Sequence, residues 1–327
     1  MKILYVYRSK SAGPSIRRVF EPIAEQLSRS NEVESIFLPF EGASIISIWK
    51  NIKFLRNHLK TNSYDIIHVT GDVYYLLWGL HKYDVVVTVH DLLFYTRINS
   101  KLKRKMMYFL ELFPLRYANA ITYISDASRE EASRFIPLQK VVSAVVYNPV
   151  SPSFQPSRKE FNKDCPTILH LGTKPNKNLP RVLEALSGVK CKLHIVGNVS
   201  EEQKKKIEDL HIEAILESNI SDGQILQAYK DCDIVSFPSL YEGFGMPIIE
   251  GQMIGRIVVT SNIEPMKSVA GEAAILINPY DISSVRGGFF RALNAQDGLV
   301  EKGYHNAKRF SVESISEQYY RIYRTII

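Results

Sequence analysis

Short runs of apolar and β-branched residues alternate with longer amphipathic stretches along almost the whole chain. Runs of about four to eight such residues are typical of strands, and longer stretches with apolar residues every three or four positions are typical of helices. The longer stretches include Ser15–Ser28 after the first run and Val312–Ile326 near the end of the chain. The pattern predicts twelve strands, at Lys2–Tyr7, Val33–Leu38, Asp65–Val69, Val85–Val89, Ala120–Ile124, Val141–Val146, Thr167–Leu171, Lys192–Val196, Ala214–Leu216, Ile234–Phe237, Ile257–Thr260 and Ala273–Ile277.

Several predicted strands are apolar at successive positions, as Val85-Val86-Val87 illustrates. Such strands are typical of parallel sheets that helices cover on both faces. The alternation is interrupted between Asn148 and Ser157, where three prolines and three serines fall within ten residues and can sustain neither a helix nor a central strand. The sequence therefore predicts an α/β fold of two doubly wound domains, and its 327 residues fit two domains of about 150 residues each.

The composition excludes several classes of protein. With 45% hydrophobic and 23% charged residues, the chain is neither a disordered tail, a collagen-like fibre nor a coiled coil. Its apolar runs fall short of the roughly 18 residues that a membrane span needs, and the run at the N-terminus is too short for a signal peptide. The three cysteines lack the spacing of metal ligands and are interpreted as reduced thiols, so we expect a cytoplasmic protein.

Positive charge is concentrated in the N-terminal half. Residues 1–150 hold 20 Lys and Arg against 13 Asp and Glu, whereas residues 151–327 hold 21 of each. Two basic amphipathic stretches lie in that half, at Ile45–Lys60 and Lys101–Leu110. In the first, the basic positions recur opposite the apolar ones, with Lys50, Lys53, Arg56 and Lys60 on one face and Trp49, Ile52, Leu55 and Leu59 on the other. Both stretches suit an anionic membrane surface, and both suit ordinary crossover helices packed on a sheet.

The loop after the predicted strand Ile234–Phe237 carries the clearest candidate chemistry, because ligands of doubly wound sheets bind beyond the carboxyl ends of strands. Gly243 and Gly245 allow a tight turn, and Pro247 suits the first turn of a following helix. The unpaired amides and positive dipole of that helix N-terminus favour a phosphate oxygen. Glu242 and Glu250 bracket this anion site and suit sugar hydroxyls, so the segment indicates a nucleotide sugar. The alternative is an ordinary helix N-terminus with Glu in its first turns.

At this point the sequence resembles a known family. The spacing of Glu242 and Glu250 matches the E-x7-E signature of retaining glycosyltransferases of family 4, which have the GT-B fold of two Rossmann-like domains facing across a cleft. Ile168–Leu179, Leu193–Gly197 and the segment 262–279 resemble further parts of that family's C-terminal half, and Thr88–Asp91 gives a weaker match in the N-terminal half.

The resemblance implies a role for each candidate residue. It implies that Glu242 and the amides of Gly243, Phe244 and Gly245 hold the transferred sugar and the diphosphate. It also implies that Lys177 pairs with the diphosphate, that Glu250 binds the ribose, and that Lys174 stands where a second positive charge is usual. His90 would face the sugar, and Gly13 would let the backbone approach the reaction centre.

The implied activity is retaining transfer of a hexose from a UDP- or GDP-linked sugar to a saccharide or a polyprenyl-linked acceptor, in bacterial surface polysaccharide synthesis. Residues 1–148 would bind the acceptor and residues 149–310 the donor, with the C-terminal helix, 311–327, packed back on the first domain. We expect no cofactor and no metal. Asp231-Cys232-Asp233 matches the D-x-D sequence that binds a metal ion in other glycosyltransferases, but it lies at a predicted helix end, where Asp commonly caps the helix or forms a turn.

Three other functions compete with this interpretation. A non-catalytic nucleotide-sugar-binding protein would keep the same anion site. A dehydrogenase is disfavoured because the loop Ser11–Ser15 lacks G-x-G-x-x-G, and a nucleic-acid binder because no recognised module is present.

Overall fold

A computed structural model describes residues 1–42, 44–136, 141–295 and 298–327. The chain forms two compact units, Met1–Pro149 with Val312–Ile327, and Val150–Ser311. Each unit contains one parallel sheet of six strands, which confirms the predicted α/β class and all twelve strands to within one or two residues at their ends.

The N-terminal unit has the strand order β2-β1-β3-β4-β5-β6. Its elements follow the chain as β1 (Lys2–Tyr7), α1 (Ser15–Ser28), β2 (Glu32–Phe37), α2 (Ile45–Thr61), β3 (Ile66–Val69), the 3-10 segment η2 (Tyr74–Gly79), β4 (Val85–Val89), α3 (Leu93–Thr96), α4 (Lys101–Met107), the π-helical η3 (Tyr108–Leu112), the 3-10 segment η4 (Phe113–Tyr117), β5 (Ala120–Tyr123), α5 (Asp126–Ser133), β6 (Val142–Val145) and, from the end of the chain, α13 (Val312–Ile326).

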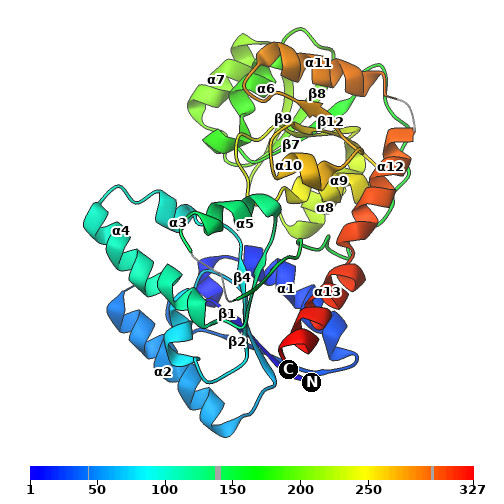
Figure 1. Ribbon diagram of the computed structural model, residues 1–327. Coiled ribbons are helices and arrows are strands. Elements are labelled where there is room, and N and C mark those ends of the chain that lie inside the picture. Colours follow the sequence, from blue (N-terminus) through cyan, green and yellow to red (C-terminus); the bar gives the residue numbers. More distant parts are fainter. Residues whose placement is uncertain (43, 137–140, 296–297) are drawn as a thin grey trace. The chain divides into compact units, whose positions relative to one another are not determined.

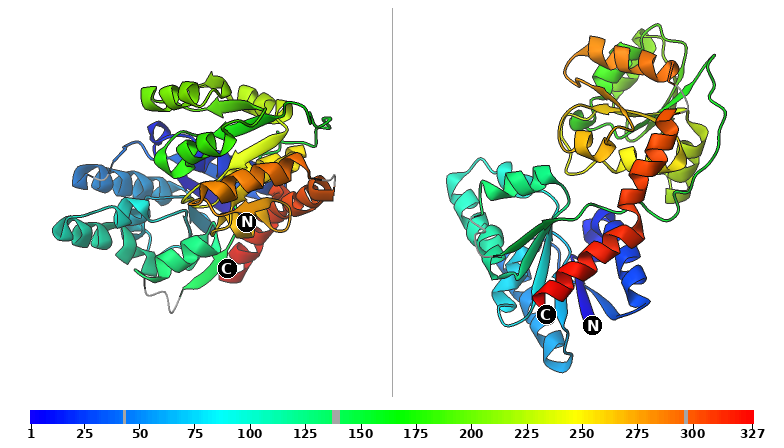
Figure 2. Two further views of the ribbon diagram at one scale, coloured as in Figure 1. Left: turned by 90° about the horizontal axis from the view of Figure 1, so that it is seen from above. Right: turned by 45° about the vertical axis from the view of Figure 1, so that its right-hand side comes forward.

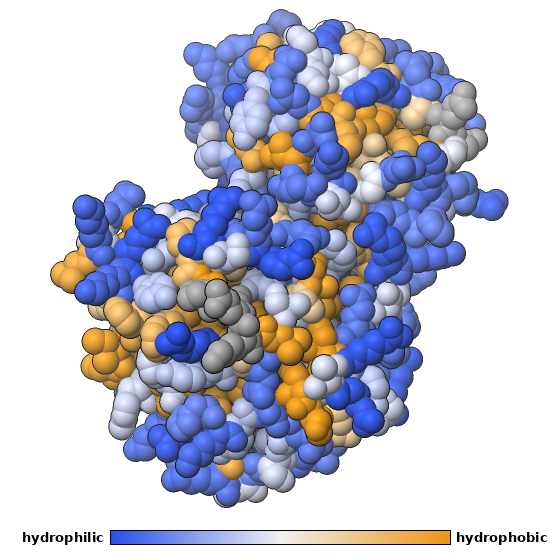
Figure 3. Space-filling view, in the orientation of Figure 1, coloured by the Kyte–Doolittle hydropathy of each residue, from blue (hydrophilic) through white to orange (hydrophobic). Residues whose placement is uncertain are grey.

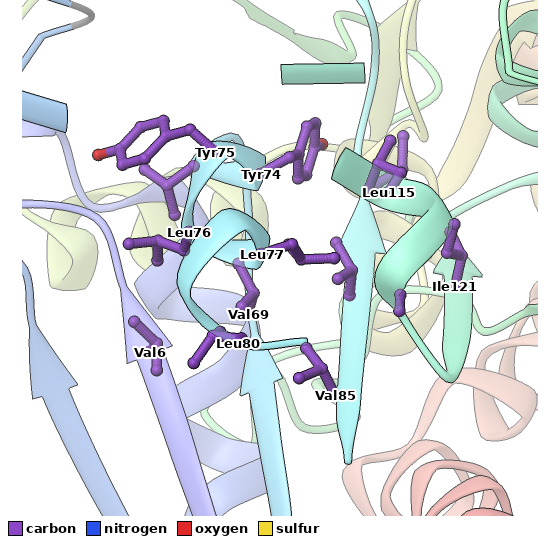
Figure 4. Close-up of a cluster of buried hydrophobic side chains, with 14 of the residues drawn as sticks. Val6, Val69, Tyr74, Tyr75, Leu76, Leu77, Leu80, Val85, Leu115 and Ile121 are labelled. Carbon is purple, nitrogen blue, oxygen red and sulfur yellow. The ribbon is translucent and has the colours of Figure 1, made fainter. Parts of the chain in front are cut away.

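Two buried clusters cover the two faces of this sheet. On one face, Leu77 of η2 and Leu80, which directly follows η2, pack over Val6, Val69 and Val85 (Figure 4). On the other face, α1 and α13 lie side by side, as Figures 1 and 2 show. The sheet is therefore buried on both sides, as its continuous apolar strands require.

The C-terminal unit has the strand order β12-β11-β10-β7-β8-β9. Its elements are β7 (Thr167–Leu171), the 3-10 turn η5 (Pro175–Lys177), α6 (Leu179–Leu186), β8 (Lys192–Val196), α7 (Glu201–Asp209), β9 (Glu213–Glu217), α8 (Asp222–Asp231), β10 (Ile234–Phe237), α9 (Met246–Ile254), β11 (Ile257–Ser261), α10 (Met266–Ala270), β12 (Ile275–Ile277), α11 (Ile282–Leu293), α12 (Gly298–Ala307) and the 3-10 turn η6 (Lys308–Phe310).

The predicted faces of α2 are correct except at Trp49. Leu55 and Leu59 are buried as predicted, but Trp49 is 59% exposed. The inward stripe of the helix begins instead at the buried Ile48, and Trp49 lies one residue, or about 100°, further round the helix.

None of the helices in the described ranges has the length and hydropathy of a membrane span. Cys165, Cys191 and Cys232 are free thiols.

Candidate active site

The strand order of the C-terminal unit places two loops at one switch point. β7 and β10 are neighbours, and the chain continues from β7 toward β8 on one side and from β10 toward β11 on the other. Loops that leave such a point diverge and leave room for a ligand beyond the carboxyl ends of the strands. The loop 172–178 follows β7 and carries Lys174 and Lys177, and the loop 238–245 follows β10 and carries Glu242.

Lys177 and Glu242 meet across these two loops. Lys177 Nζ lies 2.6 Å from Glu242 Oε1 and 4.6 Å from the centre of the Phe237 ring. The amide of Asn176 donates to the same Glu242 Oε1 at 3.2 Å, and the Leu240 backbone N–H donates to Asn176 O at 2.8 Å. Lys177 and Glu242 are only 21% and 16% exposed. Residues 65 positions apart therefore share one partly buried place.

The backbone around Lys177 is held by two residues with positive φ. Asn178 has φ 64° and is buried, and its side chain donates to the carbonyls of Pro238 at 3.1 Å and Pro279 at 2.7 Å. Gly172 has φ 90°, and a Cβ there would lie 2.9 Å from Lys177 Cγ. The loop after β7 is thus fixed to the loops after β10 and β12, and Gly172 leaves the space that the Lys177 side chain fills.

The N-terminus of α9 adjoins the Lys177–Glu242 contact in the chain. Gly245 is the N-cap residue, with φ 115° and no side chain that could cap the helix, and Pro247 lies within the first turn. Phe244, which precedes Gly245, is buried and packs edge-on against Phe310, with 5.8 Å between ring centres. An uncapped helix N-terminus offers backbone N–H groups and a positive dipole to an anion.

Glu250 lies in the second turn of α9, where Tyr229 of α8 holds it. The Tyr229 hydroxyl donates to Glu250 Oε2. Burial first, and the charge of Glu250 second, raise the pKa of Tyr229 well above its ordinary value of 10. The phenol therefore keeps its proton and remains a donor to the carboxylate near neutral pH.

Lys174 is exposed on the wall of a pocket of about 770 Å³ between the loops after β7 and β8. Lys177 and Arg181 also line this pocket, together with Gly197. Gly197 has φ 152°, and a Cβ there would lie 3.0 Å from Thr173 Cγ2 and 3.3 Å from Gly172 Cα, so glycine at 197 allows the two loops to approach each other. The volume is that of an ordinary small-molecule site, which spans about 300 to 1,000 Å³.

His170 lies on β7 beneath this loop and is buried. Burial, and secondly the positive charge of Lys177, lower the pKa of His170 to about 4. The imidazole is therefore neutral at pH 7, and it adds no second positive charge beside Lys177.

The remaining two candidates lie in the N-terminal unit, at the carboxyl ends of β1 and β4. Gly13 has φ 87° in the loop after β1, beside Arg8, whose Nη1 pairs with Asp72 at 3.3 Å. His90 follows β4, and its Nε2–H donates to Thr70 O at 2.8 Å. Burial lowers the pKa of His90, so at neutral pH its Nδ1 carries a lone pair and can accept a proton or a hydrogen bond.

The D-x-D sequence has a structural role at its second carboxylate. Asp233 is buried, accepts the backbone N–H groups of Thr167 at 2.8 Å and Asn162 at 3.1 Å, and pairs with Lys159. These bonds fix the start of β7, so the Asp233 carboxylate stabilises the fold.

Sequence reasoning missed Asn176, Tyr229 and Phe237 of this constellation. Each lies outside the Glu242–Glu250 segment, and its contact with a site residue depends on how α8, β10 and the loop after β7 pack together. Asn176 alone carried a local signal, since it directly precedes Lys177.

Two family models together match residues 12–310. The model described as glycosyl transferases group 1 matches residues 153–310, and the model described as glycosyltransferase family 4 matches residues 12–154. The chain belongs to the group 1, family 4 glycosyltransferases.

Relatives of this glycosyltransferase include two enzymes of Escherichia coli. It is 24% identical to O-antigen chain mannosyltransferase B over an alignment that covers the whole of both chains. It is 25% identical over 203 residues to the serotype-specific mannosyltransferase WbdA, covering 55% of this chain and 25% of WbdA. Among solved structures, Anabaena HepE in complex with UDP and glucose shares the fold, with a TM-score of 0.76, 17% identity and coverage of 99% of this chain and 100% of HepE. Similarity to such structures confirms the GT-B class of fold.

Proposed function

We propose that this glycosyltransferase moves a hexose from a UDP- or GDP-linked sugar to a saccharide or lipid-linked saccharide acceptor, with retention of the anomeric configuration. The observation that carries the donor assignment is the contact of Lys177 with Glu242, in the loops beside the N-terminus of α9. A cation and helix amides suit a diphosphate, and carboxylates suit the hydroxyls of a sugar and a ribose. The C-terminal unit is then the donor-binding unit, and the N-terminal unit binds the acceptor.

The proposed transfer occurs on one face of the donor sugar. The bond from the anomeric carbon to the diphosphate breaks, and its electron pair stays on the phosphate oxygen. The acceptor oxygen bonds to the same face of that carbon, and its proton passes to the leaving phosphate oxygen. Lys177 and the α9 amides stabilise the charge that develops on the diphosphate, and Glu242 holds hydroxyls of the transferred sugar.

The relatives support a role in surface polysaccharide synthesis, since the name of one specifies an O-antigen chain and both are mannosyltransferases. We therefore propose mannose as the first sugar to test and the cytoplasmic face of the membrane as the place of action. The structure of HepE contains UDP and glucose, so UDP-glucose should also be tested as a donor. The positive charge of Lys177 and of the α9 N-terminus removes the need for a metal ion, so we expect transfer to continue in EDTA.

Transfer activity of single-site variants tests this proposal. Glu242→Gln keeps the size of the side chain and removes its charge, so we expect about a 100-fold or greater loss of transfer, the magnitude typical of losing one preorganised electrostatic group. Glu213→Gln, on the surface of the same unit, is the matched control and should retain activity. NMR of the product glycoside should show the donor's own anomeric configuration.

Wild-type activity in Glu242→Gln, or an inverted product, would contradict the proposed mechanism. Donor binding without transfer to any acceptor would identify a nucleotide-sugar-binding protein instead.

A further inference from the structure

Five segments of the N-terminal unit form one continuous layer on one face of its sheet. α2, η2, α4, η3 and η4 contribute Leu55, Leu77, Met107, Leu112 and Leu115 to the same buried cluster as β1 and β3–β5. η2 packs against α2, η3 and η4, and η3 packs against α4. α2 and α4 lie on the side of the sheet away from α1 and α13 (Figures 1 and 2). We call the side of this layer that faces away from the sheet its outer face.

The outer face exposes large apolar side chains. Leu102 is 81% exposed, Ile45 71%, Ile46 68% and Trp49 59%. Smaller exposed fractions, between 38% and 46%, are found at Phe54, Trp78, Met106, Phe109 and Tyr117. The described residues of α1 and α13, on the opposite face of the sheet, include no exposed side chain of this kind. In Figure 3, orange atoms gather among blue ones at the left margin of this unit, in the region of α4.

The helices of this layer therefore carry a second apolar stripe. In α4 and η3, Leu102, Met106 and Phe109 recur at helical spacing on the exposed side, while Met107 is buried. Trp78 stacks on Phe113 at 5.6 Å between ring centres, and Phe109 packs on Phe113 at 5.7 Å, so aromatic rings link η2 to η3 and η4. A helix that only covers a sheet needs one apolar stripe, and a large exposed apolar patch marks an interaction site.

The same outer face is positively charged. Residues 45–61 and 101–117 contain nine Lys and Arg residues, Lys50, Lys53, Arg56, Lys60, Lys101, Lys103, Arg104, Lys105 and Arg116. Glu111 is the one carboxyl side chain of these two stretches; it is 3% exposed, and burial raises its pKa to about 8, so it is mainly protonated at pH 7. Within the described residues none of the nine forms an ion pair with a carboxylate.

We propose that this outer face docks on a lipid bilayer that contains anionic phospholipid. Leu102, Ile45 and Trp49 enter the boundary between headgroups and acyl chains. Eight of the nine cations are exposed and contact the headgroups, whereas the half-buried Arg104 lies over the rings of Tyr95 and Phe135. A second copy of the chain is disfavoured as the occupant, because a two-fold contact would bring the same cations face to face. A nucleic acid is disfavoured because its phosphates leave the aliphatic Leu102, Ile45 and Ile46 in water. The proposal goes beyond the donor chemistry and does not depend on it.

Vesicle co-sedimentation tests this docking, using the whole protein with phosphatidylcholine vesicles and with vesicles containing about one third phosphatidylglycerol. We expect binding to the anionic vesicles only. A charge variant, Lys101→Gln with Lys103→Gln and Lys105→Gln, should weaken that binding about 100-fold, because each cation near an anionic surface contributes about a fivefold gain. An apolar variant, Ile45→Ser with Trp49→Ser and Leu102→Ser, should weaken it about tenfold or more.

The control variant removes three exposed lysines from the C-terminal unit, as Lys190→Gln with Lys205→Gln and Lys302→Gln, and should bind vesicles like the wild type. All replaced side chains are exposed, and unchanged thermal unfolding verifies that each variant folds. Equal binding to both vesicle types, or anionic binding that survives the charge or the apolar variant, overturns the proposal. Tighter binding to RNA or to an acidic protein than to anionic vesicles also overturns it, in favour of that partner.

Discussion

At the scale of single residues, the candidate site is organised by one ion pair between two loops. Lys177 and Glu242 lie 2.6 Å apart, and each satisfies the charge of the other. A diphosphate that binds Lys177 competes for the same ammonium group and leaves Glu242 to accept hydrogen bonds from sugar hydroxyls. The ion pair therefore holds the two loops together. In our proposal it also marks the position of the donor bond that breaks, with the diphosphate at Lys177 and the transferred sugar at Glu242.

In our proposal Glu250 binds the ribose of the donor and the Tyr229 hydroxyl positions Glu250, so we predict that Tyr229→Phe weakens donor binding more than it slows transfer. Loss of one hydrogen bond to a charged group costs about 1.5 to 3 kcal/mol, which corresponds to a rise in donor KM of about tenfold or more, with kcat little changed. Steady-state kinetics over a range of donor concentrations measures both. Tyr83→Phe, in the N-terminal unit, is the control, and an unchanged donor KM in Tyr229→Phe would contradict this positioning role.

At the scale of secondary-structure elements, the π-helical η3 places a carboxyl group where water does not reach it. Glu111 Oε2 accepts the backbone N–H of Tyr75 at 3.2 Å at the start of η2, and burial raises the pKa of Glu111 to about 8. The native state thus keeps a proton that the unfolded chain releases near the ordinary glutamate pKa of 4.5. The stability of the wild type should fall as pH rises from about 5 to about 8.

Glu111→Gln tests this effect, because glutamine keeps an oxygen that can accept the Tyr75 N–H but does not titrate. We predict that the variant gains stability relative to the wild type as pH rises from 5 to 8, by at most about 1.4 kcal/mol per pH unit. Urea unfolding at several pH values measures the difference. A difference that is constant across this pH range would show that Glu111 is ionised in the native protein.

The elements were predictable from the sequence to the extent that their pattern is local. All twelve strands follow from apolar runs, since a parallel sheet covered on both faces needs such runs. The segment η2 was not predicted, because its apolar residues Tyr74–Leu77 have no helical period and its conformation depends on packing against α2, η3 and η4. The predicted position of Trp49 on the apolar face of α2 is wrong, because the packing of the helix buries its neighbour Ile48 instead.

The candidate site was predictable where its residues are close together in the sequence. Glu242, Gly245 and Glu250 fall within nine residues, and the glycine turn before a proline-containing helix N-terminus indicates an anion site without any knowledge of the fold. The Tyr229–Glu250 bond joins α8 to α9, so it requires the tertiary structure. The roles assigned to these residues stay predictions until donor binding is measured.

At the scale of the whole molecule, the last helix of the chain is anchored in the core of the first unit. The Tyr323 hydroxyl lies 2.6 Å from His68 Nδ1 and 2.9 Å from the Tyr5 hydroxyl, and His68 Nε2 lies 2.8 Å from Thr88 Oγ1. Burial lowers the pKa of His68 to about 3, so this network is uncharged at neutral pH. α13 follows directly on the C-terminal unit, which ends at Ser311, so the chain returns to the N-terminal sheet through a buried polar network.

Tyr323→Phe should therefore destabilise the N-terminal unit. The change leaves His68 and Tyr5 without their shared buried partner, and one unsatisfied buried polar group costs about 1 to 3 kcal/mol. The free energy of unfolding from urea titration measures the loss. Tyr320→Phe, on the half-buried side of the same helix, is the control, and equal stability of the two variants would contradict the importance of the network.

Donor binding at Lys177 is the central claim, and thermal unfolding with nucleoside diphosphates tests it most directly. Ligand that binds the folded state raises the unfolding temperature, and it should do so here in the presence of EDTA. We predict that UDP or GDP stabilises the wild type clearly more than ADP or CMP, and that Lys177→Ala, with its fold intact, loses most of that shift. The absence of a shift with every nucleotide, or an equal shift in Lys177→Ala, would contradict the assignment of the donor site.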